Sequence, residues 1–139
     1  MKIILASKSG VRKQILDKYK IDNEVMISNV DEDEVKKSLL EEGANPLLIS
    51  KNLAEIKSVK VSKNKPDRLV LGADSVISLN DKLINKPKSR EEAFSILKQL
   101  NNSVHYLISS VCISKNGSMI WNHTDSSELK MKNLSDSLL

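Results

Sequence analysis

The chain has 139 residues, and its 22 Lys and Arg against 18 Asp and Glu leave a formal net charge of +4. This length predicts one domain, residues 1–139, and the content of 40% hydrophobic and 29% charged residues excludes a disordered or low-complexity chain. One cysteine excludes an intrachain disulfide, and no apolar run approaches the roughly 20 residues of a membrane span, so we expect a cytoplasmic protein without membrane contact.

The chain opens with the pattern of an α/β unit. Residues 3–6 are apolar on both faces and predict a short buried strand. Small polar residues at 7–10 interrupt this strand, and apolar residues then recur at helical spacing at Val11, Ile15 and Tyr19. A strand, a polar loop and a helix in this order predict the α/β class.

The polar loop is the first candidate site. Ser7 and Ser9 lie in it, and Arg12 and Lys13 follow at the start of the predicted helix. Backbone N–H groups at a helix start bind anions, and neighbouring cations strengthen such a site, so the loop suits a phosphate. An ordinary helix cap with solvated basic residues is the alternative, since neither a P-loop nor a G-x-G-x-x-G motif is present.

Three further elements are predicted before residue 62. Loose alternation predicts a strand over residues 23–30. Acidic residues 31–34 are typical of a helix start, and a solvated start of this kind is the alternative to a functional role for any of them. Pro46 fits the first turn of another helix, whose apolar face includes Leu53 and has Lys57 beside it.

The second candidate site is Asp74. A polar loop over residues 62–67 precedes residues 69–73, which predict a buried central strand with Asp74 at its C-terminal end. Open α/β sheets place ligands at that position, where an acid can bind Mg²⁺ or accept a proton from water. Alternatively, Asp74 caps the turn into a hairpin formed by residues 76–79 and 83–84.

The segment after this hairpin holds a third candidate and another helix. Lys86 precedes Pro87, which restricts the backbone, so the lysine could reach a phosphate as a point charge; an inert surface lysine is the alternative. Ser89 and Glu92 match a capping box, which predicts a helix that continues to Leu100.

Two strands are predicted near the end of the sequence. They span residues 104–114 and 118–131, and Asn-Gly at 116–117 between them is a strong hairpin signal. Cys112 lies in an apolar part of the first strand and is expected in the core. Residues 135–136 have the pattern of a helix cap, so we expect the chain to stop where an element begins.

Five segments resemble, in order and spacing, the signature of the Maf family. Residues 4–16 resemble its opening L-A-S-x-S-P-R-R-x-x-L-L, and residues 71–77 resemble its G-A-D-T-V-V strand. The other three are Val30-Asp31-Glu32 for V-D-E, Leu53-Ala54-Glu55-Ile56-Lys57 for L-A-x-x-K and Lys86-Pro87 for K-P. The resemblance extends over essentially all 139 residues.

This resemblance implies a mixed twisted sheet with flanking helices, as in Maf and ITPase-like proteins, and a nucleoside triphosphate pyrophosphatase. Such enzymes hydrolyse normal or modified nucleotides to the monophosphate and pyrophosphate with a divalent metal, Mg²⁺ or Mn²⁺. The resemblance implies that Asp74 accepts a proton from the attacking water and that Glu32 is a second acid at the metal. It places Ser7, Arg12, Lys57 and Lys86 around the triphosphate, and Ser9 and Lys13 belong to the same anion-binding loop.

Two departures from the family pattern bear on activity. Gly10 and Val11 stand where the family has Pro and its first Arg, so the loop is less rigid and lacks one cation. The family's later K-A-G-x-Y-x-I-Q-G and G-L-P segments do not occur, so we expect a domain without its C-terminal part. An inactive nucleotide-binding remnant or a basic nucleic-acid-binding module is therefore the alternative. Scattered basic residues disfavour nucleic acid, and the resemblance also implies a homodimer.

Overall fold

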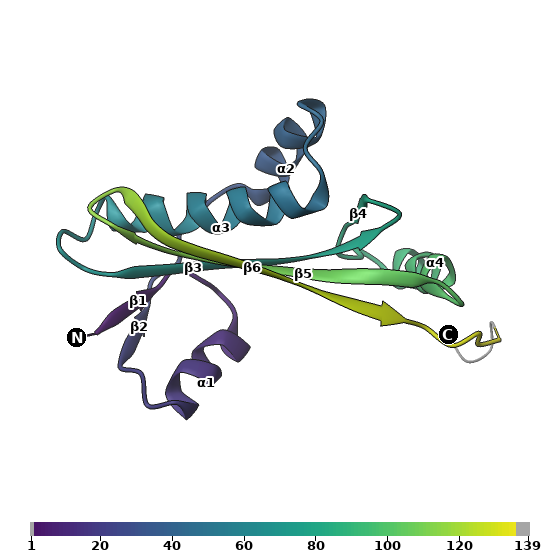
Figure 1. Ribbon diagram of the computed structural model, residues 1–139, viewed down its shortest axis with the longest axis horizontal. Coiled ribbons are helices and arrows are strands. Elements are labelled where there is room, and N and C mark those ends of the chain that lie inside the picture. The colour runs from purple at the N-terminus through teal and green to yellow at the C-terminus, as the bar shows by residue number, and fades with distance from the viewer. Residues whose placement is uncertain (1, 136–139) are drawn as a thin grey trace.

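The computed structural model describes residues 2–135, which form a six-stranded mixed sheet and four helices (Figure 1). The strands are β1 (Ile3–Leu5), β2 (Asn23–Val25), β3 (Val70–Leu79), β4 (Lys82–Ile84), β5 (Val104–Lys115) and β6 (Ser118–Lys130). The helices are α1 (Gly10–Lys18), α2 (Glu32–Glu41), α3 (Pro46–Ser62) and α4 (Arg90–Leu100). The predicted α/β class with a mixed sheet and flanking helices is confirmed.

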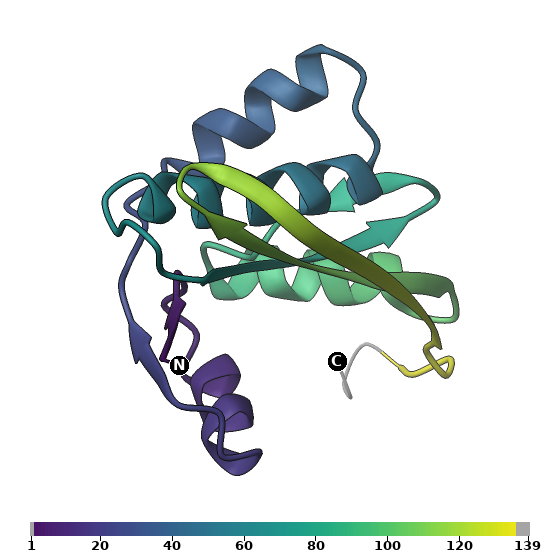
Figure 2. The same ribbon diagram turned by 60° about the vertical axis from the view of Figure 1, so that its left-hand side comes forward.

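The sheet has the order β2-β1-β3-β5-β6, and β4 pairs with β3 beside this path. Strand β1 lies parallel to both β2 and β3, whereas β5 runs antiparallel to β3 and β6 runs antiparallel to β5. Helix α3 packs on β3 and β5, with α2 beyond it, and α1 lies on the opposite side of the sheet in both views (Figures 1 and 2). The sheet and α3 therefore form the framework on which the other elements rest.

The core lies between α3 and the sheet. Ile49 and Leu53 of α3 and Val70 of β3 are fully buried there, and so is Ile4 of β1. Cys112 is 2% exposed, which confirms its predicted place in the core. No helix between residues 2 and 135 has the length and apolar character needed to cross a membrane.

Gly72 marks the closest approach of α3 to the sheet. A Cβ atom built on Gly72 lies 2.4 Å from the Ala54 carbonyl oxygen and 2.8 Å from Ser58 Cβ. Both distances are far below van der Waals contact, and the first involves backbone, which cannot rotate away. The bare backbone at residue 72 therefore allows α3 to lie against β3.

We expect Gly72→Ala to lower the free energy of unfolding by about 3 kcal/mol, at the upper end of overpacking costs, because helix and sheet must separate. Urea unfolding followed by circular dichroism measures this change. Gly10→Ala is the matched control, since its added Cβ meets no atom within 4 Å. Equal unfolding free energies for the two variants would contradict the close approach.

The local signals in the sequence are confirmed where helices begin and hairpins turn. Ser89 Oγ accepts the backbone N–H of Glu92 at 3.1 Å, although the Glu92 carboxylate receives the N–H of Lys88 and not that of the cap. Asn116 and Gly117 have φ of 51° and 82°, the two positive values that a type I′ hairpin turn requires. Interactions between residues at most four apart in the sequence were thus sufficient to predict this helix start and this hairpin turn.

Other expectations are wrong in extent. The strand predicted over residues 23–30 ends at Val25, where its pairing with β1 ends. The loop predicted from residue 62 begins one residue later, because Ser62 closes α3 and its Oγ accepts the Gly117 N–H at 2.9 Å. The helix start predicted at residues 135–136 leads into residues 136–139, which lie outside the described residues.

The apolar stripe of α1 is present but not packed. Val11, Ile15 and Tyr19 are 65%, 51% and 68% exposed, and Leu16 is the buried residue of this helix. Periodicity predicted the helix correctly because it reports an apolar face. It does not report whether a neighbouring element covers that face.

Candidate functional site

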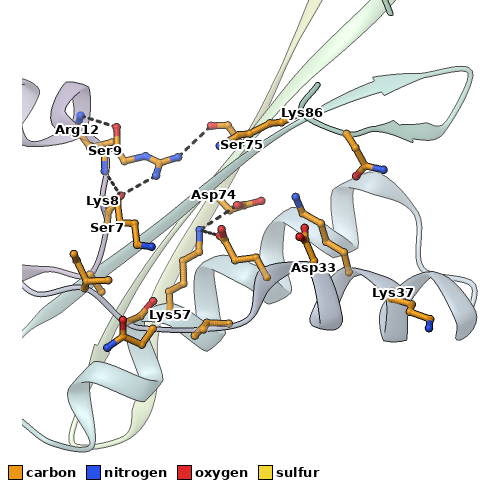
Figure 3. Close-up of a pocket in the computed structure, with 18 of the residues that line it drawn as sticks. Ser7, Lys8, Ser9, Arg12, Asp33, Lys37, Lys57, Asp74, Ser75 and Lys86 are labelled. Carbon is orange, nitrogen blue, oxygen red and sulfur yellow. Dashed lines mark hydrogen bonds and ion pairs between the residues drawn. The ribbon is translucent and has the colours of Figure 1, made fainter. Parts of the chain in front are cut away.

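A gap in the sheet beside β3 creates the site. In the described chain, β1 pairs with β3 at residues 70–71 and β4 pairs with it at 77–79, so one edge of residues 72–76 has no strand beside it. A cavity of about 1110 Å³ opens there (Figure 3). Asp74 therefore lies in the middle of β3, which corrects the prediction that it ends a strand; pairing of β3 with β5 from Val70 to Ser78 carries the strand through.

Lys57 joins two carboxylates in this cavity. It extends from α3 and is 9% exposed. Its Nζ donates to Asp74 Oδ1 at 3.2 Å and to the Ala73 carbonyl oxygen at 3.2 Å, and it forms an ion pair with Glu32 Oε1 (Figure 3). An ammonium has three N–H donors, so these three acceptors use all of them.

The two carboxylates differ in burial and therefore in pKa. Burial raises the pKa of Asp74 above its usual value, and the nearby charge of Lys57 offsets part of this effect. Partial burial also disfavours the charged form of Glu32, but the hydrogen bond and charge of Lys57 hold its pKa below the usual value. The raised pKa makes Asp74 a better proton acceptor than an ordinary aspartate, whereas the lowered pKa makes Glu32 a weaker one.

One oxygen of Asp74 is unpaired. Asp74 Oδ2 is buried and has no hydrogen-bond partner among residues 2–135, while Oδ1 faces Lys57. A buried polar atom without a partner is costly and calls for a ligand, a proton or an ion. The unpaired oxygen can therefore act as an acceptor toward a molecule in the cavity.

The loop between β1 and α1 forms the opposite wall. Ser9 caps α1 and accepts the Arg12 backbone N–H at 3.3 Å, while Ser7 Oγ accepts from Arg12 Nη1 at 3.0 Å. Arg12 Nη2 lies 3.5 Å from Ser75 Oγ, so the guanidinium spans the space between the loop and β3 (Figure 3). This geometry confirms the predicted strand, loop and helix, and it directs a fork of N–H donors to the cavity.

The cavity concentrates the positive charge of the protein. Among the described residues that line it are seven Lys and Arg and four Asp and Glu, a net charge of +3. The whole chain carries +4. A cavity with this charge and with free backbone donors attracts a polyanion.

Most of the predicted site residues meet here. The cavity is lined by Ser7, Ser9, Arg12, Glu32, Lys57, Asp74 and Lys86. Lys13 is not among the described lining residues, because its Nζ lies 3.0 Å from Asn23 Oδ1 and 3.5 Å from Asp17. The i,i+4 spacing of Lys13 and Asp17 is a signal in the sequence from which this ion pair could have been predicted.

Lys36 and Ser75 are among the lining residues that were not predicted. Lys36 stands four residues after Glu32 on α2, and this spacing places both on one face of the helix. Ser75 follows Asp74 on β3, where alternation turns neighbouring side chains to opposite faces, yet both line the cavity because it wraps around the open strand edge. The place of Lys36 beside Glu32 could be predicted from the sequence, whereas the place of Ser75 depends on the gap in the sheet.

The donor set suits a divalent cation that a phosphate also binds. Mg²⁺ is usually held by one or two carboxylates, with substrate phosphates and water completing its shell. Asp74, with its unpaired Oδ2, and Glu32 provide two carboxylates in one cavity. No group of three or more His, Cys, Asp or Glu converges in the part of the chain that the structure describes.

Comparison of sequences places the chain among known proteins. The family model described as "Maf-like protein" matches residues 2–139. A protein of Pelagibacter ubique named nucleoside triphosphate pyrophosphatase is 61% identical over 132 residues, which cover 95% of this chain and 68% of that protein. A protein of Ruegeria pomeroyi with the same name is 40% identical over 99% of this chain and 69% of its own length. A Brucella abortus relative, 33% identical over 96% of this chain and 67% of its own length, is named 7-methyl-GTP pyrophosphatase.

Comparison of structures agrees at the level of the fold. A HAM1 protein from Coxiella burnetii matches 92% of this chain and 71% of its own, with a TM-score of 0.58 at 14% identity. A dITP/XTP pyrophosphatase from Mycobacterium abscessus matches 92% and 70%, with a TM-score of 0.51 at 12% identity. The structural matches show a shared fold. The family model and the sequence identity of the relatives show that the chain belongs to the Maf family.

Proposed function

We propose that the protein is a nucleoside triphosphate pyrophosphatase, which hydrolyses the bond between the α- and β-phosphates and releases the monophosphate and pyrophosphate. The observation that carries this proposal is the pair of carboxylates held by one lysine at the edge of a cation-rich cavity. The names of the relatives support the same activity and favour it over a nucleotide-binding remnant or a nucleic-acid-binding module.

Asp74 is the proposed proton acceptor. In hydrolysis a water oxygen forms a bond to the α-phosphorus, the bond from that phosphorus to the bridging oxygen breaks, and pyrophosphate leaves with the electron pair. The water gives up one proton in this step. Asp74 Oδ2 is buried and unpaired, and its raised pKa makes it a competent acceptor for that proton.

The cations are proposed to bind and orient the triphosphate. Phosphoryl transfer depends mainly on positioning and on stabilisation of charge at the phosphate oxygens. Ser7, Ser9 and Arg12 provide hydroxyl, backbone and guanidinium donors on one wall, and Lys86 lines the cavity from the segment before α4. Lys57 keeps Glu32 and Asp74 together while the phosphates enter.

Mg²⁺ or Mn²⁺ is the proposed cofactor, and Asp74 and Glu32 are the residues that would hold it together with the phosphates. Such an ion supplies neutralisation of phosphate charge and lowers the pKa of water. The cytoplasm, where nucleoside triphosphates are made and consumed, is the proposed location. The homodimer implied by the family resemblance remains a prediction.

We expect the purified chain to release pyrophosphate from at least one member of a nucleotide panel that includes the four normal triphosphates, dTTP, dITP and 7-methyl-GTP. Chromatography identifies the monophosphate, and a coupled assay measures pyrophosphate. EDTA should reduce the rate to background, and added Mg²⁺ or Mn²⁺ should restore it. Release of single phosphate groups, or no turnover with any nucleotide, would contradict the proposed reaction.

A further inference from the structure

Two pairs of buried serines join α3 to β5. Ser50 Oγ lies 2.9 Å from Ser110 Oγ, and Ser58 Oγ lies 2.7 Å from Ser114 Oγ. All four residues are at most 1% exposed. The pairs therefore share chemistry, burial and the two elements that they connect, and they differ in what else each hydroxyl contacts.

The first pair continues to Asp74. Ser50 Oγ donates to the main-chain carbonyl oxygen of Asp74 at 3.1 Å, and Ser110 Oγ lies 3.0 Å from Thr124 Oγ1 on β6. The Ser50 hydroxyl therefore donates toward two acceptors, the Asp74 carbonyl oxygen and Ser110 Oγ, which lie on neighbouring strands β3 and β5. Ser58 donates instead to the carbonyl of Glu55 in its own helix.

Asp74 needs this support because its strand is incomplete on one side. At residues 72–76, β3 has β5 as its neighbour, while the other edge faces the cavity in the described chain. On the cavity side, Lys57 contacts the Ala73 carbonyl and the Asp74 carboxylate. The hydroxyl of Ser50 thus fastens the main chain of Asp74 from the interior, while Lys57 holds its side chain.

We propose that Ser50, which lies between the Asp74 carbonyl and Ser110, is a positioning residue that fixes the main chain of Asp74 and thereby the direction of its carboxylate in the cavity. This inference rests on the proposed pyrophosphatase function. A displacement of about 1 Å at a reacting group can reduce a rate by roughly 100-fold, so a small main-chain shift is sufficient for a measurable effect. Ser50 acts on turnover through Asp74 and has no part in binding the phosphates.

The experiment compares Ser50→Ala with Ser58→Ala in the full chain. Each change removes one buried hydroxyl from α3 and with it the contact of that helix to one serine of β5. We expect Ser50→Ala to lower kcat by about tenfold with KM within about threefold, and Ser58→Ala to leave kcat within about twofold, although both lower Tm. The substrate is the nucleotide that the wild-type protein hydrolyses fastest in the panel above.

A second pair of variants tests the same contact between Ser50 and Ser110 from the side of β5. Ser110→Ala should lower kcat in the same direction, Ser114→Ala should not, and Ser50→Ala combined with Ser110→Ala should lower kcat no further than Ser50→Ala alone. If Ser50→Ala does not fold, the comparison of Ser110→Ala with Ser114→Ala decides the matter. Equal kcat values within each matched pair, beside an active wild-type protein, would overturn this inference alone. An inactive wild-type protein would overturn the proposed function and this inference with it.

Discussion

Asp74→Asn should lower kcat for pyrophosphate release by about 10³-fold, within the range that a positioned acid–base group contributes. The amide has the shape of the carboxylate and can still accept the Lys57 hydrogen bond through its oxygen, but it cannot take a proton from water. We expect the variant to remain folded, because burial already disfavours the charged form of Asp74 and the substitution removes that charge.

Steady-state release of pyrophosphate with saturating Mg²⁺ and nucleotide measures the loss, and circular dichroism checks the fold. Asp125→Asn is the matched control, since it removes the same charge from a β6 side chain that is 80% exposed. The control should retain the wild-type rate. If Asp74→Asn keeps more than about a tenth of that rate, Asp74 is not the proton acceptor, because loss of such a group costs about 10²-fold or more.

Local chemistry predicted the framework of the site. Side chains that act within a few residues are visible in a sequence, and Ser89 as a cap and Asn116-Gly117 as a turn are examples. The family resemblance then brought distant segments into one hypothesis, and the structure puts Glu32, Lys57 and Asp74 in contact. These three come from α2, α3 and β3, so no periodicity in any one segment reports their contact.

The predicted strand end at Asp74 and the predicted place of Lys13 were wrong because contacts between distant segments decide where these side chains lie. Asp74 and Ser75 are polar and interrupt an apolar run, which suggested that the strand ends; the strand continues because this stretch faces a cavity on one edge and β5 on the other. Lys13 lies in an anion-binding loop by sequence, but Asp17 and Asn23 compete for its ammonium. A sequence shows which groups can bind, and the fold decides which of several partners is near enough.

Lys57 holds two carboxylates of the site together. Its ammonium contacts Glu32, Asp74 and the Ala73 carbonyl, and it is 9% exposed. We expect Lys57→Met to lower the free energy of unfolding by about 3 kcal/mol, because removal of one member of a buried ion pair leaves the other charge without compensation. Lys60→Met is the control on the same helix: Lys60 is exposed and its Nζ donates to the Asn29 carbonyl at 2.9 Å, so we expect less than about 1 kcal/mol.

Asp74→Asn in the Lys57→Met background tests whether Lys57 stabilises the fold through its charge or through the packing of its methylene groups. If the cost of Lys57→Met comes from the uncompensated carboxylate, the double variant should be more stable than Lys57→Met alone by about 1 kcal/mol or more, although it carries one more substitution. Pyrophosphate release should stay near background in the double variant, because neither the ammonium nor the proton acceptor is present. Urea unfolding of the wild type and the three variants provides the cycle. A double variant less stable than Lys57→Met would show that Lys57 stabilises the fold through its methylene packing, and the ion pair of Lys57 with Asp74 would then lose its role in holding the site together.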